Sequence, residues 1–120
     1  MANMTVLAER YMQAWNEADP GARRALVDEV FTGDARYTDP LADVRGTEAI
    51  DALLAEAQQR FGGLRFRVSG PVDAHHDIAR FRWHLGPDGG EPIVVGFDVI
   101  EVDGDGRIAR VAGFLDKVPA

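Results

Sequence analysis

The chain of 120 residues contains no cysteine. This absence excludes a disulfide framework, a thiolate nucleophile and any zinc or iron–sulfur centre held by cysteine. Long apolar runs are also missing, and those present are short, as at residues 93–95. A membrane-spanning helix needs roughly 18 to 20 apolar residues, so no membrane partner is expected.

Basic residues are scarce. The sequence contains thirteen Lys and Arg and twenty Asp and Glu, which gives a net charge of −7 and a pI of about 4.8. Such a chain repels phosphate backbones, and no basic stripe interleaves with aromatic residues, so no nucleic-acid partner is expected. Residues 1–15 lack a basic stretch followed by an apolar run, so a signal peptide is not indicated and a cytoplasmic location is the expectation.

Length and composition fit one domain spanning residues 1–120. No stretch resembles a linker, no internal repeat occurs, and 46% of the residues are hydrophobic. A domain of this length buries roughly two thirds of the surface that its unfolded chain exposes, so it can fold without a metal or disulfide.

Three helices are expected in the first half of the chain. Apolar residues recur at three- and four-residue steps over residues 4–18, 20–31 and 47–61. Asp19 suits the N-cap of the second helix and Pro20 its first position. Gly33 is predicted to end that helix in a left-handed conformation, and Thr47 to cap the third.

Strands are expected elsewhere. A short strand over residues 35–38 ends at Asp39 and Pro40, and a loop then leads to residue 46. After Gly62 and Gly63 the apolar period changes from about 3.6 to 2. Four long strands follow, over residues 64–74, 78–86, 93–103 and 107–118.

The predicted fold class is α+β: a cone-shaped roll with three N-terminal helices on a strongly curved antiparallel sheet of one short and four long strands. Alternation in residues 64–69 and 79–85 places apolar side chains on one face and arginines on the other. Long strands bent around three short helices leave inner surface uncovered, which predicts an apolar pocket.

The strand at residues 93–103 places a carboxylate among apolar residues. Both of its faces are rich in apolar residues, so alternation alone does not decide whether Asp98 faces inward. If it does, burial raises its pKa and favours the neutral acid, which can donate a hydrogen bond. The alternative is an aspartate at a dimer seam or one satisfied by a neighbouring backbone group.

Asp39 and Tyr11 also have two interpretations each. Asp39 precedes Pro40 at a strand end, where an Asx turn is the common structural reason for an aspartate. Tyr11 lies on the inner stripe of the first helix, where a buried tyrosine usually directs its hydroxyl to some partner. Both are nevertheless candidates for chemistry in the pocket.

No metal site or cofactor is expected. His75, His76 and Asp77 are adjacent at a predicted hairpin tip, so alternate side chains point to opposite faces. The acidic and glycine-rich residues 103–106 resemble the start of a calcium loop but lack its downstream ligands. Phosphate-loop and nucleophile-elbow motifs are absent from the sequence.

Several short motifs together resemble a known superfamily over nearly the whole chain. They include Tyr11, residues 37–40, residues 69–72, residues 96–98 and residues 106–108. The chain resembles the nuclear transport factor two-like superfamily, in its SnoaL-like and ketosteroid isomerase-like branch. The resemblance implies the cone fold and also the inward orientation of Asp98, although function transfers poorly between members of a fold.

The resemblance also implies three catalytic residues. Asp39 takes the place of the general base, Tyr11 that of the oxyanion-hole tyrosine, and Asp98 that of the protonated oxyanion-hole acid. Phe31 and Leu54 stand where steroid isomerases have supporting tyrosines, so the hydrogen-bond network is expected to be thinner here.

The resemblance implies a cofactor-independent isomerase or cyclase that removes a proton next to a carbonyl and stabilises the enolate. A ligand-binding or dimerisation domain of the same fold is the alternative. A small apolar carbonyl-containing ligand is the expected partner, together with a second copy of the chain bound through the outer sheet face. The side chains expected to contact the ligand are Trp15, Phe31, Leu54, Phe66, Phe81, Trp83, Ile100, Val111 and Leu115.

Overall fold

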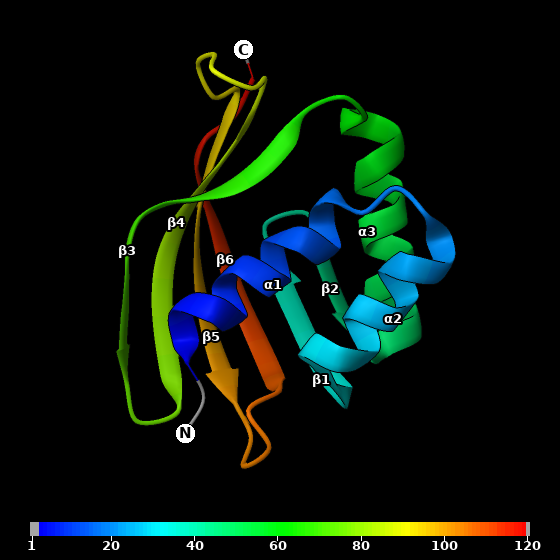
Figure 1. Ribbon diagram of the computed structural model, residues 1–120, viewed down its shortest axis with the longest axis vertical. Coiled ribbons are helices and arrows are strands. Elements are labelled where there is room, and N and C mark those ends of the chain that lie inside the picture. Colours follow the sequence, from blue (N-terminus) through cyan, green and yellow to red (C-terminus); the bar gives the residue numbers. More distant parts are fainter. Residues whose placement is uncertain (1–2, 120) are drawn as a thin grey trace.

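The computed structural model describes residues 3–119, and three helices cover one side of a curled, unclosed sheet (Figure 1). The helices are α1 (Met4–Asn16), α2 (Pro20–Val30) and α3 (Thr47–Phe61). The strands are β1 (Phe31–Asp39), β2 (Ala42–Arg45), β3 (Arg65–His75), β4 (Ile78–Gly86), β5 (Val94–Val102) and β6 (Ile108–Lys117). The predicted α+β class is confirmed.

The sheet has six strands in the order β2-β1-β6-β5-β4-β3. All neighbours are antiparallel except β1 and β6, which run parallel. The prediction of five antiparallel strands is therefore wrong in two details. Ala42–Arg45 forms a short strand against β1 instead of a loop, and the parallel pair brings the end of β1 beside β6.

The helix ends follow local capping chemistry, with two exceptions to the predictions. Asp19 Oδ2 accepts the Ala22 N–H at 2.8 Å, and Pro20 begins α2, as predicted. Gly33 does not end α2, because the chain becomes extended at Phe31 and Gly33 lies within β1. Thr47 is not a cap either, since Gly46 holds that position with a φ of 94°.

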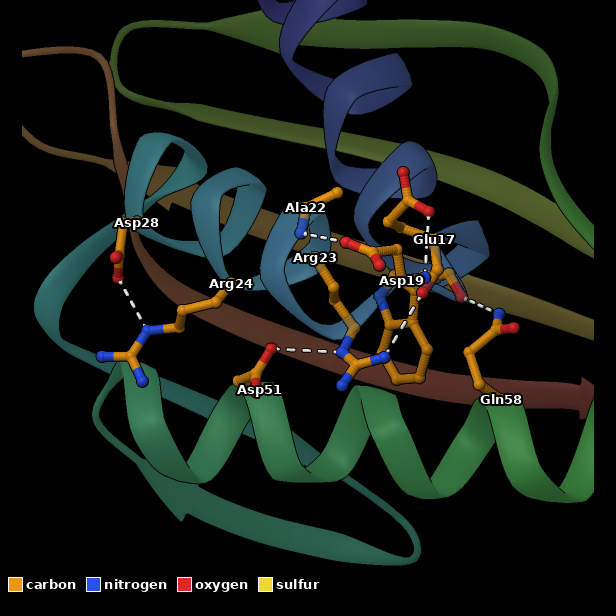
Figure 2. Close-up of polar contacts among 9 residues, drawn as sticks. Glu17, Asp19, Ala22, Arg23, Arg24, Asp28, Asp51 and Gln58 are labelled. Atoms are coloured by element: carbon orange, nitrogen blue, oxygen red, sulfur yellow. Dashed lines mark hydrogen bonds and ion pairs between the residues drawn. The ribbon is translucent and has the colours of Figure 1, made fainter.

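The three helices are tied together near the end of α1 (Figure 2). Arg23 is buried, and its Nε donates to Asp51 Oδ1 of α3 at 3.1 Å. The same guanidinium reaches the Glu17 carbonyl after α1. Gln58 of α3 donates to the Trp15 carbonyl. These contacts fix where α1 presents its inner face to the sheet.

The core lies between α1 and the inner face of the sheet. Along β5 the even-numbered residues are buried and the odd-numbered ones are partly or fully exposed, so the set that contains Asp98 faces inward. Tyr11, Phe31, Phe81, Leu54 and Ile100 are each at most 1% exposed. None of the described helices has the length and apolar character needed to cross a membrane.

Candidate active site

The centre of the site is a hydrogen bond between a helix and a strand. The Tyr11 hydroxyl on α1 donates to Asp98 Oδ2 on β5 at 2.9 Å, and both residues are buried. Tyr11 is 0% exposed and Asp98 is 2% exposed. This hydrogen bond directly joins two of the three predicted catalytic residues.

Burial controls the protonation of Asp98. Desolvation raises its pKa from 3.8 to about 6, and the nearby charge of Asp39 acts in the same direction. The Trp83 indole and the Tyr11 hydroxyl oppose this rise because they are donors that favour the carboxylate. The neutral acid therefore persists to a pH well above that of an ordinary aspartate.

Two buried tyrosines face this acidic centre. Burial raises the pKa of Tyr11 well above 10, and the charge of Asp98 adds to the rise. Burial likewise raises the pKa of Tyr37 well above 10, followed by the charges of Asp98 and Asp39. Both phenols are therefore neutral hydrogen-bond donors at any ordinary pH.

Asp39 ends β1 and uses its two oxygens differently. Oδ1 accepts the Leu41 and Ala42 N–H groups, each at 2.8 Å, which is the Asx turn expected for an aspartate in this position. Oδ2 accepts the Tyr37 hydroxyl at 2.6 Å. Asp39 is only half-buried, so one carboxylate oxygen is oriented by a buried phenol at the edge of the core.

Gly113 of β6 brings the two carboxyl groups together. It pairs with Asp98 on β5, while its neighbour Ala112 pairs with Thr38 on β1. A methyl group added at Gly113 would lie 2.9 Å from Asp98 Oδ1 and 3.3 Å from Asp39 Cβ. Both carboxyl groups therefore crowd the same stretch of β6 backbone, and only glycine leaves them room.

Aromatic rings surround the Tyr11 phenol. The rings of Trp15, Phe31 and Phe81 each lie edge-on to it, with centroids 5.9 to 6.3 Å away. Trp15 continues through Phe66 to Trp83 in a row with centroid separations of 5.2 and 5.5 Å. The Tyr11–Asp98 pair therefore lies among aromatic rings that exclude water from it.

The residues predicted to contact a ligand all belong to the core or pack against it. Phe31, Leu54, Phe81, Ile100 and Val111 are at most 1% exposed, and Leu115 is partly exposed. Trp15, Phe66 and Trp83 keep 7 to 8% exposure. The row formed by these three rings is therefore the part of the aromatic shell that solvent approaches most closely.

The predicted apolar pocket remains a prediction. A groove of about 640 Å³ lies near the start of α1 and the β5–β6 turn, and a hollow of about 530 Å³ lies near α1 and α2. Neither is lined by Tyr11, Asp39 or Asp98. Within residues 3–119 no cluster of three or more His, Asp or Glu side chains is placed to hold a metal ion.

Comparison with known proteins assigns the chain to a family. The sequence profile of the SnoaL-like domain matches residues 8–111, which is most of the chain. This protein belongs to the SnoaL-like family. A search of curated proteins gives no match.

Solved structures of SnoaL-like proteins share the fold. A candidate isomerase of this family from Agrobacterium tumefaciens is 39% identical, with a TM-score of 0.88 over 93% of this chain and 96% of that one. A candidate polyketide cyclase from Sinorhizobium meliloti is 25% identical, with a TM-score of 0.70 over 89% and 92%. A candidate ketosteroid isomerase from Kribbella flavida, 23% identical over 96% and 78%, has a TM-score of 0.70 and supports the fold alone.

Tyr37 is the site residue of this SnoaL-like chain that sequence reasoning did not select. Its ring is buried, and its hydroxyl holds the Asp39 carboxylate. The signal was present in the alternation of β1, because Ala35, Tyr37 and Asp39 occupy every second position and face the same side. The strand predicted from the sequence covered only residues 35–38, which is too short for that pattern to be recognised.

Proposed function

We propose that this SnoaL-like protein is a small-molecule isomerase or cyclase that removes a proton next to a carbonyl group and stabilises the resulting enolate. One observation carries the proposal: a half-buried carboxylate at Asp39 and a buried acid–phenol pair at Asp98 and Tyr11 lie on either side of Gly113. One group accepts a proton, and the other two donate hydrogen bonds to an oxygen.

In the proposed reaction, Asp39 Oδ2 takes the proton from the carbon next to the carbonyl. The electrons of the broken C–H bond form a carbon–carbon double bond, and the carbonyl oxygen becomes an enolate oxygen. The Tyr11 hydroxyl turns from Asp98 Oδ2 to donate to this oxygen, and neutral Asp98 donates its own proton to it. An isomerase then returns the proton to a different carbon. In a cyclase, the enolate carbon instead attacks a second carbonyl carbon of the same molecule. The π electrons of that carbonyl move to its oxygen, which takes the proton back from Asp39.

The environment of Asp98 supports this division of roles. With a pKa of about 6, the acid is mostly neutral in mildly acidic solution, and about a tenth of it is neutral at pH 7. An enolate oxygen beside it adds negative charge and favours the proton further. A neutral Asp98 therefore suits the donor role.

The hydrogen bonds of Asp39 support a second candidate, a ligand-binding or dimerisation domain without catalysis. Its Oδ1 is fully explained by the Asx turn to Leu41 and Ala42, which needs no chemistry. The two candidates differ in whether Asp39 Oδ2 exchanges protons with a bound ligand.

Proton exchange at carbon in D₂O distinguishes these candidates without knowledge of the natural substrate. A small β,γ-unsaturated ketone and a 1,3-diketone are incubated with the protein, and loss of the α-proton signal is followed by NMR. Exchange should fall at least about a hundredfold in Asp39→Asn, which keeps the turn-forming oxygen, and in Asp98→Ala.

Asp34→Asn is the matched control. Asp34 also lies on β1, but it is exposed and its carboxylate accepts the nearby Thr32 hydroxyl. Its exchange rate should match that of the wild type. If Asp98→Ala leaves the exchange rate unchanged, the proposed role of Asp98 is wrong. If the wild type exchanges no faster than buffer, the non-catalytic candidate stands.

A further inference from the structure

The two tryptophans of the chain share an unusual feature. Trp15 on α1 and Trp83 on β4 are each 8% exposed, and both indole nitrogens are buried. Neither Nε1–H finds an acceptor in hydrogen-bond geometry among residues 3–119. An indole nitrogen can only donate, so no rotation of the group supplies another partner.

Unpartnered donors of this kind are rare in folded proteins. Most buried polar side-chain atoms have at least one partner, and exceptions commonly mark functional sites or bound molecules. Leaving a buried donor without an acceptor costs free energy because its hydration is lost without replacement. Two such donors at either end of one aromatic row therefore indicate a shared role.

Both indoles lie beside the proposed oxyanion site. Trp15 lies close enough to the Tyr11 hydroxyl to oppose the rise that burial and Asp98 impose on its pKa, and Trp83 has the same effect on buried Asp98. Neither contact completes a hydrogen bond. One free donor therefore accompanies each member of the Tyr11–Asp98 pair, with the Phe66 ring between the two indoles.

The backbone holds these rings in place. The Asn16 side chain bonds both the N–H and the carbonyl of Phe66, each at 2.8 Å, which ties the end of α1 to β3. Gln58 of α3 holds the Trp15 carbonyl. Trp83 lies against Gly96, where an added methyl group would be 2.0 Å from the indole ring. The two donors are therefore preorganised by the fold.

From these contacts we propose that Trp15 and Trp83 donate their indole N–H groups to oxygens of the bound ligand. The ligand is then a flat, conjugated oxyanion of the enolate or phenolate class that carries more than one acceptor oxygen. Four side chains would donate hydrogen bonds to this ligand: the two indoles, the Tyr11 phenol and the neutral Asp98 acid. This inference rests on the proposed function and specifies the substrate class, since an isolated ketone offers too few acceptors.

The test uses the two indole N–H signals in a ¹H–¹⁵N spectrum, which Trp→Phe variants assign unambiguously. The probe is 2,4-dinitrophenolate, which is flat, rich in acceptor oxygens and ionised at mildly acidic pH, where Asp98 keeps its proton. Phenol serves as the neutral, single-oxygen analogue. On titration with the dinitrophenolate, both indole proton signals should move downfield, and phenol should bind more weakly.

Variants separate donation from packing. Trp15→Phe and Trp83→Phe should each weaken dinitrophenolate binding about tenfold, because each removes a hydrogen bond to a charged acceptor. Phe66→Leu is the matched control, since it alters the same aromatic row without removing a donor and should weaken binding much less. If a Trp variant fails to fold, the wild-type indole shifts still decide the question.

Two results would overturn the inference, and they are distinguishable. One result is that Tyr11→Phe weakens dinitrophenolate binding, while titration of the wild type moves neither indole signal. The inference then fails and the proposed oxyanion site stands. If the dinitrophenolate at millimolar concentration shifts neither the indole signals nor the signals of Tyr11, both the inference and the oxyanion site are wrong.

Discussion

The Tyr11 hydroxyl donates a 2.9 Å hydrogen bond to Asp98 Oδ2 across a sequence separation of 87 residues. This contact joins α1 to the inner face of β5 in a site from which water is largely excluded. A carboxyl group in such a place is costly to ionise, and that cost links the stability of the fold to the chemistry of the site.

Stability should decrease as Asp98 ionises. The folded-state pKa of about 6 lies above the ordinary 3.8, so in this window the folded protein binds more protons than the unfolded chain. The free energy of unfolding should therefore fall by about 2 kcal/mol as the pH rises from 3.8 to 6. Asp98→Asn removes this contribution.

Urea unfolding of the wild type and Asp98→Asn across this window measures the effect. Relative to the wild type, the free energy of unfolding of the variant should rise by about 2 kcal/mol from pH 3.8 to pH 6, because the other titrating groups are common to both proteins. Parallel stability curves would show that Asp98 ionises normally in the folded protein.

Gly113→Ala should disturb both carboxyl groups at once. The added methyl group would lie 2.9 Å from Asp98 Oδ1 and 3.3 Å from Asp39 Cβ. We expect a loss of about 1 to 3 kcal/mol in the free energy of unfolding, with a loss of α-proton exchange. Gly104→Ala, which meets no atom within 4 Å, is the control. Equal effects of the two changes would show that the crowding at Gly113 has no consequence.

Arg23 is expected to stabilise the helical layer much more than its neighbour Arg24 does. Arg23 pairs with Asp51 where its own side chain is 7% exposed, whereas the Arg24–Asp28 pair is about half exposed on both sides (Figure 2). Arg23→Met should lower the free energy of unfolding by about 2 kcal/mol, because Asp51 then lacks its partner. Arg24→Met should cost about 0.5 kcal/mol or less. Thermal and urea unfolding provide the comparison, and similar losses would contradict it.

The outer sheet face remains our proposed dimer surface. Phe97 on β5 pairs with Phe114 on β6, and Phe114 is 58% exposed. Arg80 and Arg82 on the same face have aspartate partners in their own chain, so we expect the contact to be centred on the apolar residues. Sedimentation at micromolar concentration should give a dimer, and Phe114→Asp a monomer. Val6→Asp, an exposed position on α1, should remain dimeric; a monomeric wild type would refute the proposal.

Sequence reasoning succeeded where one local pattern dominates. The third helix ends at Phe61 before two glycines, and β4 spans the predicted residues 78–86. The burial of Asp98 is also confirmed, but the alternation of β5 alone did not decide it, because both of its faces are rich in apolar residues. The resemblance to known proteins settled the choice.

The remaining features depend on contacts that are distant in sequence. Residues 42–45 are too few and too polar to indicate a strand, and β2 exists because β1 offers it an antiparallel edge. The extension of β1 back to Phe31 depends on parallel pairing with β6. The free indole donors of Trp15 and Trp83 follow from how three elements pack together, which no local pattern records.

The pH dependence of α-proton exchange tests the central claim most directly, namely that neutral Asp98 helps Asp39 form an enolate. The wild-type exchange rate should fall as the pH rises through about 6, because the donor is lost as Asp98 ionises. Asp98→Asn keeps an amide donor that does not titrate, so its slower exchange should lose this decline. A wild-type rate that stays constant or rises through this pH would contradict the account.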